Sequence, residues 1–230
     1  MRSDDPNLPF LQSIAVALGD LRERVVFVGG SNAGLLITDA AAEGVRPTRD
    51  VDAIVEAGDL AQFYRIEAEV ATRGFVRDTQ DGVICRWIHT DTGVLFDLMP
   101  VDPRVLGFSN RWYAEAVRTA QTVSIGDGIT IRMVSGPAFV ATKLEAFADP
   151  KRGANDFLAS HDLEDVLNVV DGRPELIEEL TAAPQPLRDA VRKSISTLLR
   201  HPDFANSLPG LIADSGRTAI VMARLRNMAG

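Results

Sequence analysis

The spacing of apolar residues changes near residue 135, and this change restricts the chain to few architectures. Before it, short apolar runs alternate with segments of helical spacing; examples are VVFV at 25–28, which ends in a glycine pair, and DVDAIV at 50–55. Such runs indicate strands interleaved with helices. From Ser135 onward the helical spacing continues to the end. The sequence therefore predicts an α/β domain over residues 1–134, followed by an all-helical domain over residues 135–230.

Helix and turn signals refine the order of elements in the first domain. Helices are expected over residues 9–24, 31–44 and 58–74, where apolar residues recur at helical spacing, and a glycine ends the last two. Ser31 and Asp59 are the predicted N-caps of the last two. Strands are expected at the apolar runs 25–30, 50–55, 83–90, 94–101 and 128–134. The residues DTG between two of these runs predict an antiparallel hairpin.

Composition excludes several classes of protein. With 230 residues, 46% apolar and 24% charged, the chain is long and apolar enough for a folded core. The single cysteine permits no internal disulfide, and its apolar surroundings favour a packing role. The three histidines are scattered, so no zinc motif is present. The N-terminal segment lacks a signal-peptide core, and no run reaches the roughly 18 apolar residues of a membrane span. We therefore expect a cytoplasmic protein.

The charge is distributed unevenly. The net charge of −8 argues against a general nucleic-acid binder. From Gln185 onward, however, seven basic residues and three acidic residues give this segment a charge of +4. Two interpretations stay open, a solvated helical face or a local contact surface for a polyanion.

Three aspartates in apolar strands carry the strongest functional signal. Asp50 and Asp52 lie one residue apart, so a strand turns both carboxylates to one face. Asp97 interrupts another apolar run, where by itself it could be an exposed residue. If the strands are neighbours, the three carboxylates repel one another unless they share a divalent cation. Carboxylate oxygens are the ligands that Mg²⁺ prefers, with waters and phosphate oxygens as the remaining ligands.

A Gly-Gly-Ser segment lies between the first strand and the next predicted helix. Gly29 and Gly30 would allow an anion to approach the backbone, and Ser31 adds a hydroxyl. The segment lacks the Lys-Ser/Thr of a Walker A loop and the glycine spacing of a dinucleotide site. An ordinary strand-to-helix turn capped by Ser31 is the alternative.

Taken in order, these motifs resemble the nucleotidyltransferase superfamily of the DNA polymerase β type. The segments VGGSNAGLL, RPTRDVDAIV and LFDLMPV carry the resemblance, together with the helical stretch 139–170. Within the superfamily the chain is most similar to the AbiEii/MenT group of toxin nucleotidyltransferases from bacterial toxin–antitoxin pairs. The resemblance covers roughly residues 25–170.

The resemblance implies a mixed β-sheet with flanking helices and a metal-dependent enzyme. Mg²⁺ or Mn²⁺ would be held by the catalytic residues Asp50, Asp52 and Asp97. NMP would pass from an NTP, such as ATP, to a tRNA, another RNA or a protein, with release of pyrophosphate. A cognate antitoxin would be a further partner. The residues expected to bind the nucleotide are Gly29, Gly30, Ser31, Lys143 and Asp162.

Other interpretations stay open. A small-molecule nucleotidyltransferase of the antibiotic-modifying kind would share the site, and so would a nucleotide-binding module without activity. Lys143 could simply pair with Glu145 or Asp149 on an amphipathic helix. Asp162 and Asp165 could complement the dipole of a helix capped by Ser160.

Overall fold

The computed structural model describes residues 5–80, 82–150 and 157–230, and these residues form two compact units. One unit contains Pro6–Asn32 and Arg46–Val134 and holds the β-sheet. The other contains Asp5, Ala33–Val45 and the described part of Ser135–Gly230, and it is helical. The predicted domains of 1–134 and 135–230 stay a prediction. Part of the helical stretch 139–170, residues 151–156, lies outside the described residues.

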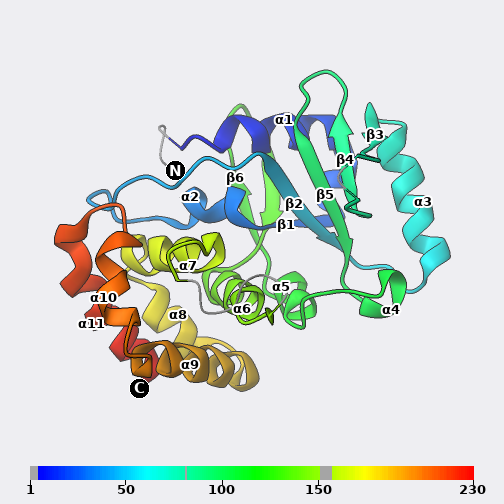
Figure 1. Ribbon diagram of the computed structural model, residues 1–230. Helices are drawn as coiled ribbons and strands as arrows, with labels where there is room; N and C mark the ends of the chain where they lie inside the picture. The colour runs from blue at the N-terminus through cyan, green and yellow to red at the C-terminus, as the bar shows by residue number, and fades with distance from the viewer. Residues whose placement is uncertain (1–4, 81, 151–156) are drawn as a thin grey trace. The chain divides into compact units, whose positions relative to one another are not determined.

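Within the described residues, seven strands form one mixed sheet in the order β3-β4-β5-β2-β1-β7-β6 (Figure 1). Strand β2 runs parallel to β5 and antiparallel to β1, and β1 runs parallel to β7. The predicted hairpin is confirmed, because β4 and β5 are antiparallel. The strand bounds are β1 Val25–Val28, β2 Asp50–Val55, β3 Phe75–Arg77, β4 Arg86–His89, β5 Leu95–Pro100, β6 Gln121–Ser124 and β7 Thr130–Met133.

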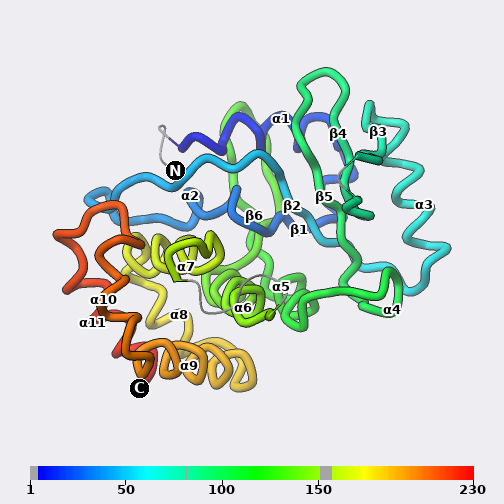
Figure 2. Tube along the Cα trace, viewed as in Figure 1, coloured from blue at the N-terminus to red at the C-terminus, as the bar shows by residue number. Residues whose placement is uncertain are grey.

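The centre of the sheet is buried because its strands are short apolar runs. All four residues of β1 are buried, and Val51, Ile54 and Phe96 of the neighbouring strands are fully enclosed. Helix α1 (Leu8–Leu18) contacts β2, and helix α3 (Leu60–Ala71) contacts β3. The chain trace in Figure 2 shows β2 and β5 side by side although they are far apart in the sequence.

A side-chain cap fixes the start of helix α3 in the sheet unit. As predicted, the side chain of Asp59 caps α3 by accepting a hydrogen bond from the Gln62 backbone N–H. Two shorter helices, α4 (Pro103–Leu106) and α5 (Tyr113–Arg118), follow β5. The predicted mixed α/β sheet with flanking helices is confirmed.

The helical unit is built from amphipathic helices. Helix α6 contacts α7 and α9, and α9 contacts α11. Helix α9 buries Leu187, Val191, Ile195 and Leu198, the spacing of a helix with one apolar face. The bounds are α2 Ala33–Leu36, α6 Gly136–Phe147, α7 His161–Gly172, α8 Leu176–Ala182, α9 Gln185–Arg200, α10 Phe204–Ser207 and α11 Thr218–Ala229.

The predicted helix over residues 31–44 is wrong. A 3₁₀ turn, η2 (Gly30–Asn32), precedes α2, which ends at Leu36. The chain then leaves the helix because the N–H groups of Thr38 and Asp39 both donate to the carbonyl of Gly172, at 2.8 and 2.9 Å. These tertiary hydrogen bonds outweigh the helix propensity of the alanine-rich residues that follow.

Two basic residues of the C-terminal segment serve internal contacts. Arg217 is buried, and its Nε lies 2.7 Å from Oδ1 of Asp171, while its Nη2 lies 2.7 Å from Oδ2 of Asp39. Arg224 donates to the carbonyl of Val170. The surface charge of this segment is therefore lower than its sequence indicates. No helix in the described part of the chain is long and apolar enough to cross a membrane.

Candidate metal centre

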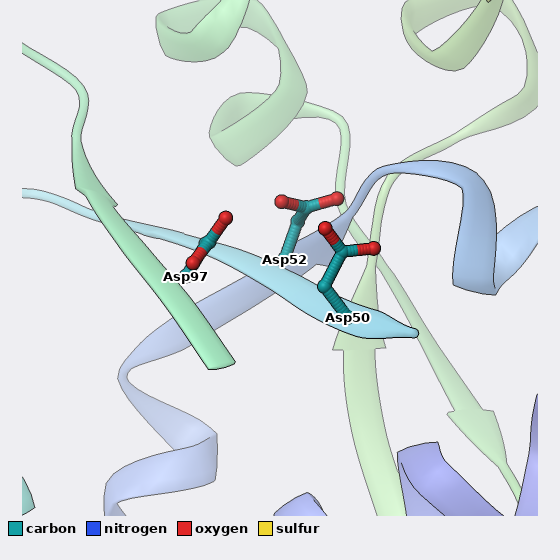
Figure 3. A group of neighbouring side chains, drawn as sticks. All are labelled: Asp50, Asp52 and Asp97. Atoms are coloured by element: carbon teal, nitrogen blue, oxygen red, sulfur yellow. The ribbon is translucent and has the colours of Figure 1, made fainter. Parts of the chain in front are cut away.

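Three carboxylates converge on one face of the sheet. Asp50 and Asp52 lie on β2 and Asp97 lies on β5, and each offers an oxygen within 4.8 Å of the others (Figure 3). Asp97 is buried, at 6% exposed, whereas Asp50 and Asp52 are half-buried. The expectation that these strands are neighbours is thus confirmed, and the three residues are positioned to bind a metal ion.

The sheet register explains why the carboxylates meet. Asp52 and Asp97 are direct partners on parallel strands, and Asp50 lies two residues before Asp52 on the same face. Like charges placed directly opposite one another destabilise a sheet. The fold therefore needs positive charge at this point.

Arg86 supplies part of that charge, and the sequence reasoning missed it. On β4 it is the direct partner of Asp97. Its Nε lies 2.9 Å from Oδ1 of Asp97, and its Nη2 lies 2.7 Å from Oδ2 of Asp97 and 3.2 Å from Oδ2 of Asp50. The hydrogen bonds to Asp97 and the neighbouring carboxylate charges raise the pKa of Arg86, although burial opposes this shift.

The predicted hairpin makes the strands of Arg86 and Asp97 neighbours, but its register is off by one residue. With DTG as the turn, residue 90 pairs with 94, which sets residue 87 opposite 97. In the structure the strands are joined through residues 90–93, and this register sets Arg86 opposite Asp97, on the same face of the sheet.

Gly29 provides the space for the carboxylate of Asp52. Its φ of +79° lies in the left-handed region that favours glycine. A Cβ at this position would lie 1.9 Å from Oδ2 of Asp52 and 2.8 Å from its Cβ. The sequence predicts that an anion approaches this glycine, and in the structure the approaching anion is the side chain of Asp52.

The rest of the Gly-Gly-Ser segment is buried. Ser31 is 1% exposed, and its hydroxyl has no hydrogen-bond partner within the described residues. The predicted N-cap role of Ser31 is therefore wrong. The side chain of Asn32 instead donates to the carbonyl of Val28 and ties the turn to β1. Gly30 is also buried.

Lys143 and Asp162 lie in the helical unit. The Nζ of Lys143, on α6, lies 3.0 Å from Oδ1 of Asp162 and 2.7 Å from Oδ2 of Asp165, both on α7. The side chains of Lys143, Asp162 and Asp165 are 13%, 10% and 1% exposed. Burial lowers the pKa of Lys143, but the two carboxylates together outweigh burial and raise it. Ser160 caps α7 as predicted, by accepting from the Leu163 N–H.

These contacts leave the nucleotide roles of Lys143 and Asp162 as predictions. What the structure adds is a buried ion cluster in which one lysine faces two acids. Removal of one member of a buried ion pair is costly, because the remaining charge loses a close partner of opposite sign.

The donor set at the sheet fits a hard divalent cation. Three carboxylates supply oxygen ligands of the kind that Mg²⁺ and Mn²⁺ take. Their formal charge of −3, with +1 from Arg86, leaves −2, which one divalent cation balances. We therefore assign a possible metal site to Asp50, Asp52 and Asp97.

Comparisons with known proteins add little to this assignment. No family model matches the sequence, and no curated protein matches it. Among solved structures, the chain is similar to an antigenic nucleotidyltransferase-like protein from Paracoccidioides brasiliensis, at 18% sequence identity. The match covers 93% of this chain and 97% of the other, with a TM-score of 0.49. A similarity at this level assigns neither a family nor an activity to the chain.

Proposed function

We propose that the chain is a Mg²⁺- or Mn²⁺-dependent nucleotidyltransferase that transfers NMP from an NTP to a hydroxyl acceptor. The supporting observation is the convergence of Asp50, Asp52 and Asp97 beside the turn at Gly29. A carboxylate pair on one strand and a third carboxylate on its neighbour form a surface that suits a cation and the phosphates bound to it.

Each part of the proposed site has a separate task. Asp50, Asp52 and Asp97 would hold the cation, which would supply positive charge to the triphosphate and to the attacking and leaving oxygens. The Gly30 N–H and the Ser31 hydroxyl hold the β- and γ-phosphates. Asp97 orients the acceptor hydroxyl or takes its proton.

The bond changes balance without a further reactant. The acceptor oxygen forms a bond to the α-phosphorus as the bond from that phosphorus to the β-phosphate oxygen breaks. Pyrophosphate leaves with the electron pair, and the acceptor proton passes to a carboxylate or to water. Lys143 and Asp162, by the same proposal, contribute to nucleotide binding, with the lysine offsetting phosphate charge.

For the acceptor we propose RNA, and tRNA in particular, or a protein, with the chain acting as the toxin of a toxin–antitoxin pair. The order of the motifs supports this proposal. The four basic residues of α9 also support it, because cationic side chains bind nucleic-acid phosphates: Arg188, Arg192, Lys193 and Arg200. A cognate antitoxin would be the protein partner.

One observation favours a second candidate, a nucleotide-binding module without activity. Arg86 already holds both oxygens of Asp97. If this contact persisted with nucleotide present, Asp97 would be less available to a cation, and turnover would be lost while nucleotide binding remained.

The test is incubation with each α-³²P-labelled NTP, Mg²⁺ and total RNA, beside the Asp52→Asn variant. Asp91→Asn, which changes an exposed aspartate in the β4–β5 turn, serves as the matched control. Label in RNA with wild type and Asp91→Asn, but not with Asp52→Asn, supports the proposed reaction. Equal labelling by Asp52→Asn would refute the metal assignment. NTP binding without labelling of RNA, protein or small hydroxyl acceptors would favour the inactive module.

A further inference from the structure

Arg86 is largely buried, unlike the arginine of a surface ion pair. Its side chain is 15% exposed, and that of Asp97 is 9% exposed. The guanidinium uses two nitrogens on the two oxygens of Asp97, the planar two-point contact that arginine makes best with a carboxylate. The same Nη2 reaches Asp50 at 3.2 Å. Arg86 is therefore a fixed cation within the carboxylate cluster.

A divalent cation and Arg86 would both bind the carboxylate oxygens of Asp97. A cation bound by all three aspartates takes an oxygen from Asp97, and both oxygens of Asp97 already accept hydrogen bonds from Arg86. A carboxylate oxygen retains a second lone pair, so the contact does not block binding outright. The two positive charges would nevertheless lie within a few ångströms of each other and repel.

We propose that Arg86 is a built-in counter-cation that positions the carboxylates in protein lacking a divalent cation and competes with that cation for Asp97. The proposal rests on the proposed function only for the presence of a cation at the three aspartates. It assigns to Arg86 two opposite effects, stabilisation of the cation-free fold and weakening of cation binding.

The experiment is calorimetric titration of the full chain with Mn²⁺ alone, after treatment with a chelator. Because the guanidinium charge repels a cation at the same carboxylates, Arg86→Gln is expected to bind Mn²⁺ at least about tenfold more tightly than wild type. Arg104→Gln is the matched control, because it removes an arginine whose side chain is 86% exposed. Its Mn²⁺ affinity is expected to equal that of wild type.

Thermal unfolding supplies the second readout. In chelator, Arg86→Gln is expected to unfold at a lower temperature than wild type, and Mn²⁺ is expected to raise its unfolding temperature more than it raises that of wild type. Should Arg86→Gln not fold, Arg86→Lys carries the test. It keeps the charge but loses the two-point contact, so its Mn²⁺ affinity should exceed that of wild type by a smaller factor.

The outcomes separate this inference from the proposed function. If wild type binds Mn²⁺ and the Arg86 variants bind it equally or more weakly, the competition is refuted and the proposed function stands. If only Arg86→Gln binds Mn²⁺, the competition is supported and the proposed function is refuted, because Arg86 then replaces the metal in the native protein. If neither binds Mn²⁺, both are refuted.

Discussion

Replacement of Gly29 by alanine tests whether the turn after β1 determines the position of Asp52. The new Cβ would lie 1.9 Å from Oδ2, 2.7 Å from Cγ and 2.8 Å from Cβ of Asp52. Atoms do not approach this closely, so one of them must move. Because the close contact extends to the Cβ of Asp52, a rotation of the carboxylate alone does not relieve it. Since the Cβ is fixed to the strand, the backbone of Gly29 or of Asp52 has to shift as well.

Two terms set the expected loss of stability. A left-handed φ costs an alanine about 1–2 kcal/mol, and over-packing that forces a backbone shift adds about 1–3 kcal/mol. Together they lower the free energy of unfolding by roughly 2–5 kcal/mol. In a chain of this size each kcal/mol corresponds to about 2–4 °C, so the unfolding temperature should fall by about 4–20 °C. Mn²⁺ affinity should fall at least about tenfold, because one ligand leaves its position.

Gly107 provides the control. Its φ is +81°, close to that of Gly29, but a Cβ there would meet nothing within 4 Å. Gly107→Ala should therefore show only the conformational cost of about 1–2 kcal/mol and normal Mn²⁺ binding. Thermal unfolding and Mn²⁺ calorimetry on both variants complete the comparison. Equal stability and equal Mn²⁺ affinity in the two variants would show that Gly29 does not position Asp52.

Three further variants test other parts of the site. Asp52→Asn should abolish Mn²⁺ binding while the cation-free protein unfolds at an equal or higher temperature, since a repelling charge is lost; unaltered Mn²⁺ affinity would contradict the metal assignment. Ser31→Ala should change stability by less than about 1 kcal/mol, because the buried hydroxyl has no hydrogen-bond partner among the described residues, yet weaken NTP binding; an unchanged NTP affinity would leave Ser31 without a role in binding. Lys143→Met should lower the free energy of unfolding by about 3–5 kcal/mol, because Asp162 and Asp165 lose a buried cation at close range. In wild type the raised pKa of Lys143 means that its ion pairs stabilise the fold below the ordinary value of 10.5 and that this stabilisation is lost as pH rises through the raised pKa; a melting series that shows the same alkaline loss in Lys143→Met would exclude Lys143 as its source.

Five of the seven described strands were predicted, because their signal is local. Short apolar runs became β1, β2, β4, β5 and β7, and the alternation of side chains placed Asp50 and Asp52 on one face. Strands β3 and β6 were not predicted. The helix predicted over residues 31–44 failed because its end is decided by the Gly172 carbonyl, a partner distant in the sequence. No local pattern contains that contact.

The three aspartates of the candidate site could be predicted from the sequence, but the arginine that pairs with them could not. Repulsion among the three aspartates indicated a positive partner, and a metal was the inference. Arg86 was overlooked because its role depends on the register of β4 with β5, and the turn predicted at DTG would set residue 87, not residue 86, opposite Asp97. Similarly, the two glycines indicated an approaching anion without indicating that Asp52 is that anion.

The register of the sheet thus joins the stability of the fold to its proposed chemistry. Residues 86, 97 and 52 form one row across β4, β5 and β2, with a cation at one end and two anions beside it. The row is stable when positive charge balances the aspartates, and either Arg86 alone or Arg86 with a divalent cation supplies such charge. If the protein is an enzyme, the divalent cation must bind in the presence of Arg86. If it is an inactive module, Arg86 must remain hydrogen-bonded to Asp97 and exclude the cation. The Mn²⁺ affinities of wild type and of Arg86→Gln therefore distinguish the two functions. Both depend on how positive charge near the three aspartates is divided between Arg86 and the divalent cation.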